Sequence, residues 1–563
     1  MERAIPTGTE RRQARAPWVC ALAAALVALL ATSGQSLAQG AAQPPILSGP
    51  LAKLDIKNAE IAPSRGKSEG RLIVAQHFAL DPGWLNPLQH SYAVTQQHYD
   101  YLLHDALIKP MPQGEMTYSL AEHAEMAADF KAAAFRLRPG LKFQDGTPLT
   151  TADVRWTYEN FKGANAKLFH DKLDRFQIVD DRTIIFHFKE PFIDFMDMYN
   201  GVVSGIGWIV PAKYYDKVGS DGFKQQPIGA GPYKLVSQEA GTQMVFEAWQ
   251  DYWRQVPVTK TIIVKGIRDP ASRLAGLQTG ELDIAYGLTG KLLPRVMSDK
   301  NLRWEPNYTA PWFLIFPSYS EKDSPFHDKR VREAVSLSLN RAFLSKQETQ
   351  GIGKPWGNWL SAEQRDALPG DKMVPEYNPE KAKKLLAEAG FPNGFDFDWY
   401  VPFVPYFDMG QRILADLRAV GIRGKLEVLE GPAFRSKIGQ GRKGFPGNRI
   451  VQNIDPRPGG AKANIGVYAV CGGAASFICE PKIEELWKKH QASLDGEERD
   501  DLIKSIQQIL LKEYYFVPIY LNSFVAAVGP RVLPEGDGFH KYWDTRHAPY
   551  PWPWEVWQVK TGS

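Results

Sequence analysis

The sequence predicts an α/β protein with at least two domains. Apolar strand-like runs alternate with helical segments whose ends carry capping residues, which is the pattern of α/β layers. The chain has 563 residues, more than one hydrophobic core usually organises. These two observations together indicate a multidomain α/β protein.

The N-terminus has the features of a cleaved signal peptide. A leader with four arginines precedes an apolar stretch at 18–30. That stretch is shorter than the roughly 20 residues that a membrane-spanning helix needs. Ser36 and Ala38 then match the small residues that a signal peptidase requires. We expect a signal peptide at 1–38, cleavage near Ala38, and a mature chain of 525 residues.

The charge and the cysteine content limit where the protein can reside and which partners it can bind. The net charge falls from +4 to +2 on cleavage, because four arginines and two glutamates leave with the signal peptide. A nearly neutral protein lacks the concentrated basic face that nucleic acid requires, so we expect no nucleic-acid partner. Cys20 lies inside the apolar stretch and not where a lipid would be attached. An exported protein without a lipid anchor indicates the periplasm.

Two cysteines, Cys471 and Cys479, remain in the mature chain. In an oxidising compartment the default for such a pair is a disulfide bond. No further Cys or His stands at zinc-ligand spacing. We therefore predict a structural disulfide that closes a short loop.

The secondary structure can be followed along the chain. Residues 39–70 are rich in Pro, Gly, Ser and charge, and we interpret them as a flexible leader. Strands are predicted at 71–75, 183–188, 244–247, 261–265, 313–316, 396–400, 425–429 and 524–528. Helices are predicted from Asn378-Pro379 to Gly390, from Asp269-Pro270 to Gly280, before Gly421, and around 331–339, from caps and apolar spacing.

Residues 135–154 contain a strand, a Pro-Gly turn, a second short strand, an Asp-Gly turn at Asp145-Gly146, and a helix capped by Thr150 or Thr151. This run resembles the bacterial extracellular solute-binding proteins of the dipeptide, oligopeptide and nickel importers. Further similar blocks follow in order at 227–234 (a Gly-x-Gly-Pro-Tyr turn), 251–253, 277–283, 326–341, 377–391 and 517–520. The resemblance extends from about 71 to about 528.

This resemblance implies a two-lobed periplasmic-binding-protein fold of the Venus flytrap type. Lobe I would comprise 71–308, with an extra subdomain inserted at roughly 90–225, and the C-terminal return 525–563. Lobe II would comprise 309–524. The function implied is that of a monomeric substrate-binding component of an ABC importer. It would capture a small solute, above all a short peptide, and deliver it to the membrane permease subunits without enzymatic activity or a cofactor.

Several residues are candidates for ligand contact. Trp84, Trp312 and Trp356 lie where the resemblance implies proximity to the ligand, although each would serve equally well as a core residue. Asp455 is the candidate partner of a peptide ammonium group, and Arg457 is the candidate partner of a ligand carboxylate. The chain departs from the family pattern here, because no Asp closely precedes Asp455 and two glycines follow where an aromatic residue is usual. An ordinary turn carboxylate remains an alternative for Asp455.

Other functions remain open at this stage. The same fold would serve an opine, an oligosaccharide or a metal chelate, and a closed form could also dock to a sensory receptor. The 11 histidines show no metal-site spacing, and we predict no protein-bound metal. An exported hydrolase would need a catalytic motif, and neither His-Glu-x-x-His nor Gly-x-Ser-x-Gly is found.

Overall fold

The structure is a computed structural model of the chain. It describes residues 45–59, 67–89, 94–111, 114–163, 166–199, 206–361, 366–401, 406–429, 431–447, 449–453, 460–473, 475–533, 554 and 557–560. The helices and strands below all lie in the compact unit Gly49–Ser563. The expected signal peptide lies outside the described residues. Within the described part of the chain, no helix combines the length and the apolarity needed to cross a membrane.

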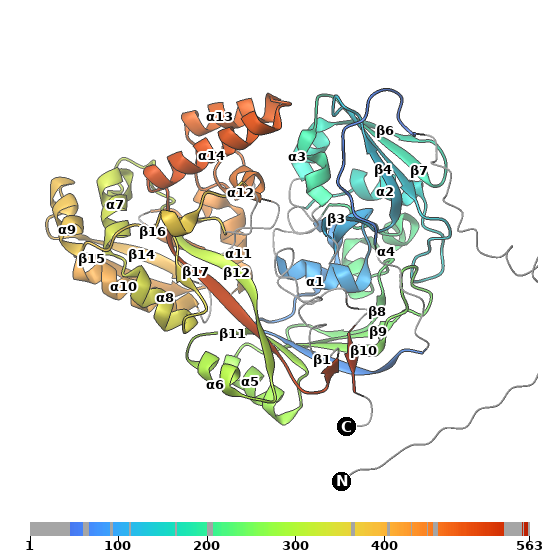
Figure 1. The fold of residues 1–563 in the computed structure, drawn as a ribbon, viewed down its shortest axis with the longest axis horizontal. Helices are drawn as coiled ribbons and strands as arrows, with labels where there is room; N and C mark the ends of the chain where they lie inside the picture. The colour runs from blue at the N-terminus through green and yellow to red at the C-terminus, as the bar shows by residue number, and fades with distance from the viewer. Residues whose placement is uncertain are drawn as a thin grey trace, which may run out of the picture. The chain divides into compact units, whose positions relative to one another are not determined.

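A mixed sheet of 11 strands runs through the described residues. Its strand order is β15 (Ile422–Val428), β14 (Phe395–Val401), β16 (Arg449–Asn453), β12 (Arg303–Ile315), β17 (Phe516–Val528), β11 (Ile284–Leu288), β1 (Glu69–Gln76), β10 (Thr259–Gly266), β9 (Gln243–Ala248) and β8 (Tyr233–Glu239), with β13 (Lys354–Pro355) paired to β17. Strand β1 is parallel to β10 and β11, and β14 is parallel to β15 and β16. The antiparallel pair β12–β17 joins these two halves (Figure 1).

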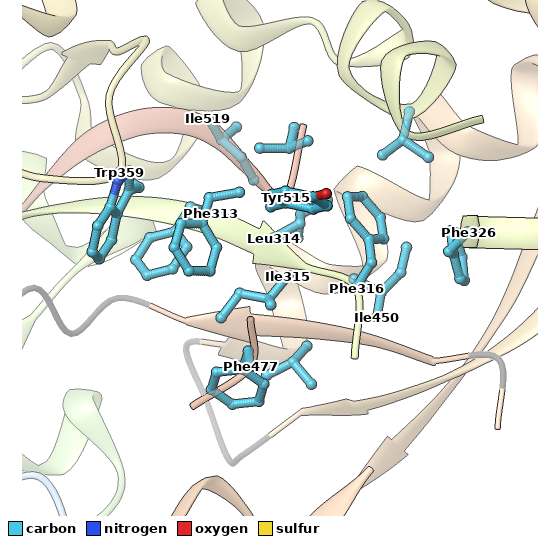
Figure 2. Packing of buried hydrophobic residues seen from close by; sticks show 14 of the residues in the cluster. Phe313, Leu314, Ile315, Phe316, Phe326, Trp359, Ile450, Phe477, Tyr515 and Ile519 are labelled. Atoms are coloured by element: carbon cyan, nitrogen blue, oxygen red, sulfur yellow. The ribbon is translucent and has the colours of Figure 1, made fainter. Parts of the chain in front are cut away.

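Lobe II is built around one hydrophobic core, whose buried members all lie between Trp312 and Tyr520. The end of β12 is covered on both faces, because four consecutive side chains from Phe313 to Phe316 are fully buried. Figure 2 shows this cluster, in which the Phe313 ring lies 5.6 Å from Phe516 and 5.9 Å from Trp359. The helices of lobe II are α7 (Lys329–Ser338), α8 (Arg341–Thr349), α9 (Pro379–Glu388), α10 (Tyr406–Ala419), α11 (Gly431–Gly439), α12 (Gly460–Tyr468), α13 (Pro481–Ala492) and α14 (Gly496–Lys512).

Lobe I has separate cores on the two faces of its sheet. Along β1, Leu72 and Val74 join one core while Ile73 and Ala75 join the other, as the alternation of side chains along a strand requires. The helices that contribute to these cores are α1 (Val94–Leu103) on the first face, and α5 (Pro270–Thr279) and α6 (Leu293–Ser298) on the second. The sheet of lobe I is therefore covered on both faces.

A second sheet within lobe I has its own core of buried residues. The strands are β4 (Ala121–Met126), β5 (Ala132–Leu137), β7 (Thr183–Phe188) and β6 (Leu173–Ile178) in that order, beside the pair β2 (Ile108–Met111) and β3 (Gly114–Tyr118). The helices of this part are α2 (Thr151–Glu159), α3 (Ala166–Lys172) and α4 (Ala212–Gln225). These elements lie between Ile108 and Gln225, and the extra subdomain expected at roughly 90–225 stays a prediction.

Among the strands that the structure describes, only β12 and β17 carry hydrogen bonds in both halves of the large sheet. Residues 303–306 of β12 pair with the end of β17 beside β11, and residues 313–315 pair with β16. Between them, Tyr308, Thr309 and Ala310 pair only with β17 among the described strands. We call this stretch, with its β17 partners 522–524, the hinge ribbon. The expected lobe boundaries at 308/309 and 524/525 fall in or next to it.

The Gln144-Asp145-Gly146 run of the sequence forms a joint with the Gly-x-Gly-Pro-Tyr turn. The buried Gln144 amide donates to the carbonyls of Leu103, Gly231 and Tyr233 at 2.7–3.0 Å, and its oxygen accepts from the Gly229 backbone at 3.1 Å. A Cβ atom on Gly229 would lie 2.0 Å from the Leu103 carbonyl oxygen, which explains the need for glycine there. The two sequence blocks thus encode one packing contact.

Buried arginines explain the Arg-Val-Arg block in the same way. The Arg332 guanidinium donates to the carbonyls of Phe326, His327 and Glu513, and that of Arg341 donates to Pro518 and Ser336. These hydrogen bonds tie the helices α7 and α8 to the segment that enters β17. The block therefore encodes the scaffold of lobe II and no chemistry.

The described parts of the two terminal segments are attached to lobe I. Part of the expected flexible leader is bonded to lobe I, because the backbone of Lys57 bonds with Met116 and Tyr118 of β3, and that of Ala52 bonds with Met126 of β4. A polar composition did not reveal this backbone pairing. At the other end, Trp554 and Trp557 are buried in the core that contains Leu72, and β18 (Val532–Leu533) pairs with β19 (Gln558–Val559).

Replacing Gln144 by Ala should destabilise the protein, because the substitution leaves buried backbone groups without their partner. We expect a loss of about 3 kcal/mol in the free energy of unfolding. Urea denaturation of the mature protein, followed by circular dichroism, measures this loss. The matched control is Gln177→Ala on the exposed side of β6, for which we expect a change of about 0.5 kcal/mol or less. Equal losses of stability in the two variants would refute the role of Gln144 as a buried hydrogen-bonding joint.

His98 predicts a pH dependence of stability. Its ring is 2% exposed and lies 4.5 Å from the Trp554 ring, and burial lowers its pKa from 6.5 to about 3. Between these pH values only the unfolded chain binds the proton, so stability falls as the pH decreases. From pH 7 to pH 4 we expect this group to cost about 3 kcal/mol. The His98→Gln variant should show a correspondingly shallower pH dependence in denaturant titrations, and an unchanged slope would rule out this origin.

Candidate functional site

The carboxyl ends of three parallel strands lie at one edge of lobe II. Val401 of β14 pairs with Val428 of β15, and Tyr400 pairs with Val451 of β16, so the three strands end together. In open α/β sheets, ligands bind in the crevice outside the carboxyl ends of the strands. Residues 454–459 connect β16 to α12 at this edge. Asp455 and Arg457 belong to that connection, and both lie outside the described residues.

The same edge adjoins the hinge ribbon. Asn453, the last residue of β16, pairs with Phe313, which directly follows Trp312. Trp312 and Pro355 pair with the same residue of β17, Tyr520, from its two sides. The backbone thus brings Trp312, Trp356 and the start of the 454–459 connection close together. They are 142 residues apart at most, and they meet because β17 lies between β12 and β13.

The side chains of Trp312 and Trp356 are nevertheless almost fully buried. Each is 2% exposed, and Trp312 belongs to the core of lobe II. The indole nitrogen of Trp356 donates to the Leu360 carbonyl at 2.8 Å, and the Lys354 ammonium lies 5.1 Å from the ring centre. A ligand would reach either indole only after a local movement of the surrounding residues.

Trp84 lies apart from these two tryptophans. It follows β1 in the 3-10 helix η1 (Pro82–Leu85), where the Asp81 carboxylate accepts from the Gly83 backbone at 2.8 Å. Its ring is 7% exposed and lies 5.2 Å from Phe78 and 5.9 Å from Tyr99 in a core of lobe I. This environment corresponds to the core alternative that the sequence left open.

Four charged side chains connect lobe I to lobe II. Asp194 and Asp197 lie on the 3-10 helix η3 (Ile193–Tyr199) of lobe I, whereas Lys462 lies on α12 and Arg499 on α14 of lobe II. The Lys462 ammonium contacts the Asp194 carboxylate at 3.0 Å and also that of Asp197. The Arg499 guanidinium contacts Asp194 at 2.6 Å. We call these four residues the charged quartet.

All members of the charged quartet are largely shielded from water, with exposed side-chain fractions between 8% and 26%. Burial raises the pKa of Asp194, but Lys462 and Arg499 lower it more, and the net pKa lies far below the usual range. Burial lowers the pKa of Lys462, but Asp194 and Asp197 raise it more, and the net pKa lies above its usual value. Asp194 and Lys462 are therefore both ionised at neutral pH.

The sequence analysis did not find the charged quartet. In the sequence, Asp194 and Lys462 are 268 residues apart, and neither belongs to a recognisable motif. The one available signal is the spacing of Asp194 and Asp197, since side chains three residues apart in a 3-10 helix point in the same direction. That spacing does not identify the partner.

The two cysteines form a disulfide in the structure, with their Cα atoms 4.5 Å apart. It closes the loop between α12 and α13. The Cys471 backbone donates to the Glu484 carboxylate at 2.7 Å, and the Cys479 backbone donates to the Tyr319 hydroxyl at 2.9 Å. The loop is thus attached both to α13 and to the segment after β12.

A metal site and a second ligand pocket are the other kinds of site that a protein of this size can carry. No group of three or more His, Cys, Asp or Glu side chains among the described residues is arranged to hold a metal ion. A groove of about 780 Å³ lies on lobe I, lined by the start of β1 and by the residues around Trp249. None of its lining residues comes from lobe II, and the Lys234 ammonium in it already donates to the Gln144 carbonyl at 2.6 Å.

Comparison with known proteins identifies the family. Residues 115–447 match the model described as bacterial extracellular solute-binding proteins, family 5 middle. The chain belongs to this family. Its joint at Gln144 and its buried Arg332 and Arg341 are therefore parts of a solute-binding scaffold.

Relatives and solved structures agree with this assignment. The dipeptide-binding protein of Escherichia coli K12 is 26% identical over 469 residues, which cover 76% of this chain and 85% of that protein. The structure of the PBP AgaA in complex with agropinic acid, from A. tumefacien R10, aligns with a TM-score of 0.72 at 20% identity, covering 88% of this chain and 99% of the other. NikA from Staphylococcus aureus in complex with Ni(L-His)2 aligns with a TM-score of 0.70 at 17% identity, covering 87% and 100%. The two-lobed fold is shared by all of these structures.

Removing the disulfide should lower stability. Replacing both Cys471 and Cys479 by Ser frees a short loop in the unfolded chain, which should cost about 2.5 kcal/mol. Thermal denaturation of the mature protein, with and without reductant, measures the loss. Reductant should lower the melting temperature of the unsubstituted protein and leave that of the double variant unchanged. If reductant lowered the melting temperature of both proteins, the loss of stability would not come from this disulfide.

Proposed function

We propose that this protein is the soluble substrate-binding component of an ABC importer, and that it captures a short peptide between its lobes. The observation that carries the proposal is the similarity to a dipeptide-binding protein over 85% of that protein's length. Family membership supports solute binding, and the relative's name supports peptides as the solute class. In this proposal the protein hands the solute to membrane permease subunits and does not change it chemically.

The hinge ribbon supplies the movement that such a protein needs. A two-stranded ribbon twists more easily than the interior of a wide sheet, because fewer hydrogen bonds hold it. A ligand that contacts both lobes binds the closed form better, and this difference in affinity alone shifts the population toward closure. The closed surface then differs from the open one, and the permease can distinguish the two forms.

We place the ligand at the carboxyl ends of β14, β15 and β16. In this proposal Asp455 pairs with the peptide's ammonium group, and Arg457 with a ligand carboxylate. A partly buried carboxylate gains most from a charged hydrogen-bonding partner, which a peptide ammonium provides. Trp312 and Trp356, and Trp84 from lobe I, would contribute the apolar part of the site only after a local rearrangement that exposes them.

The remaining assignments follow from export. We propose that residues 1–38 are removed and that the mature monomer resides in the periplasm. One lobe would comprise 71–308 together with 525–563, and the other would comprise 309–524. Residues 39–70 would connect the cleavage site to lobe I. The joint at the Gln144 amide keeps the inserted part fixed to lobe I during closure.

A second candidate ligand class is supported by the solved structures. Proteins that bind agropinic acid or Ni(L-His)2 share the fold over 87–88% of this chain. An opine or a metal chelate is therefore the alternative to a peptide. It would be enclosed by the same two lobes, through a different set of contacts at the 454–459 connection.

A ligand screen tests the proposal. Di- and tripeptides at about 100 times their dissociation constant should add roughly 2.7 kcal/mol of stability, which a thermal-shift assay of the mature protein detects. Opines, oligosaccharides and nickel chelates are assayed beside them. If one of these classes stabilises the protein and no peptide does, that class replaces peptides as the proposed ligand.

The Asp455→Asn variant then tests the site. With a peptide identified in the screen, its affinity measured by calorimetry should fall at least tenfold, because the ammonium group loses its charged partner. The matched control is Asp500→Asn, which removes an exposed carboxylate from α14 of the same lobe and should leave the affinity unchanged. Equal affinities of the Asp455→Asn variant and the unsubstituted protein would remove Asp455 from the site.

A further inference from the structure

Each half of the charged quartet is held in place by contacts within its own lobe. On lobe I, Phe195 and Met196 anchor η3 in the core of the second sheet. Side chains three residues apart in a 3-10 helix eclipse one another, so Asp194 and Asp197 present their carboxylates in the same direction. This geometry explains how both reach one ammonium group.

The cationic half is held equally firmly within lobe II. The Arg499 guanidinium donates to the carbonyls of His490 at 2.5 Å and Ser493 at 3.3 Å, which fixes it independently of Asp194. Lys462 lies in the first turn of α12, whose far end leads into the disulfide loop. Little side-chain entropy is therefore lost by Arg499 when the halves meet.

The charge balance of the quartet favours its burial. Two carboxylates face two cations, so the net charge that closure removes from water is zero. Each ion nevertheless loses hydration, which only good geometry and hydrogen bonding can offset. That geometry is present, because one Asp194 oxygen accepts from Lys462 at 3.0 Å and from Arg499 at 2.6 Å, while Asp197 also accepts from Lys462.

We propose that the charged quartet is a latch that stabilises the closed form independently of the ligand. All four groups belong to the protein and lie on opposite lobes, so their contacts form whenever the lobes close and are lost when they open. The apparent affinity for any ligand depends on the fraction of binding-competent protein. The latch thus sets affinity for every solute by the same factor without contributing to the choice of solute.

Distances between labels in the ligand-free mature protein test the latch. Lys167 on α3 and Lys384 on α9 have exposed side chains, at 87% and 77%, and replacing both by Cys provides one label site on each lobe. Labelling without reductant leaves Cys471 and Cys479 in their disulfide. Pulsed electron paramagnetic resonance between two spin labels then gives the distribution of interlobe distances.

In this background, Lys462→Met should shift the population from the short-distance to the long-distance form. The expected loss is at least tenfold in the closed-to-open ratio, because Lys462 makes two charged hydrogen bonds. Asp197→Asn removes only one contact and should shift the ratio in the same direction by less. Circular dichroism verifies that each variant is folded, and the milder Asp197→Asn variant keeps the test valid if Lys462→Met does not fold.

A double substitution separates the latch from a general loss of stability. Asp197→Asn and Lys462→Met remove the same contact, so together they should shift the closed-to-open ratio by less than the product of their separate factors. The matched control is Lys329→Met, which breaks an ion pair with Glu513 inside lobe II, 3.0 Å long, and should not change the distances. Unchanged distances in Lys462→Met, or separate factors that simply multiply in the double variant, would overturn the latch. Because no ligand is present, either result leaves the proposed function to be decided by the ligand screen.

Discussion

The antiparallel pairing of β12 with β17 is the constraint on which the rest of the structure depends. Each strand has 13 residues and carries hydrogen bonds in both halves of the large sheet. The register shifts between Pro306 and Tyr308 and again between Trp312 and Phe313, so the hinge ribbon is bounded by an irregularity on each side. Such irregularities increase local twist and interrupt pairing. In the proposed closure, bending would be concentrated in this short stretch while the flanking sheets stay rigid.

This concentration explains the position of the candidate site. Asn453 at the carboxyl end of β16 pairs with Phe313, three residues after the hinge ribbon, so a ligand there would lie close to the axis of the proposed movement. A small rotation of the lobes moves residues near the axis by a short distance and remote residues by a long distance. The charged quartet joins η3 to α12 and α14, elements outside the large sheet, and contacts there are more sensitive to the opening of the lobes.

Local physics made much of the fold predictable. The helices that begin at Asn378-Pro379 and Asp269-Pro270 were predicted from their caps, and the structure places the capping oxygens 3.0 and 2.7 Å from the expected backbone nitrogens. The strand at 183–188 was likewise confirmed. The length of β12 and β17, the backbone pairing of Lys57 and the partners of Asp194 depend on contacts between distant segments, which no local pattern encodes. Asp455 and Arg457 stay predictions, because no described residue tests their contacts.

The division of labour between hinge, ligand site and latch has an energetic consequence. Closure is stabilised by contacts of the ligand with both lobes and, in our proposal, by contacts of the protein with itself. A ligand can shift the equilibrium only by the difference between its affinities for the two forms. A small solute offers few contacts, so a protein that supplies part of the closing energy needs less from its ligand. The same contribution also populates the closed form without ligand, so the latch must stay weaker than a typical ligand if the permease is to distinguish loaded from empty protein. A quartet whose charges must lose their hydration in order to pair provides such a limited contribution, because desolvation offsets most of the attraction.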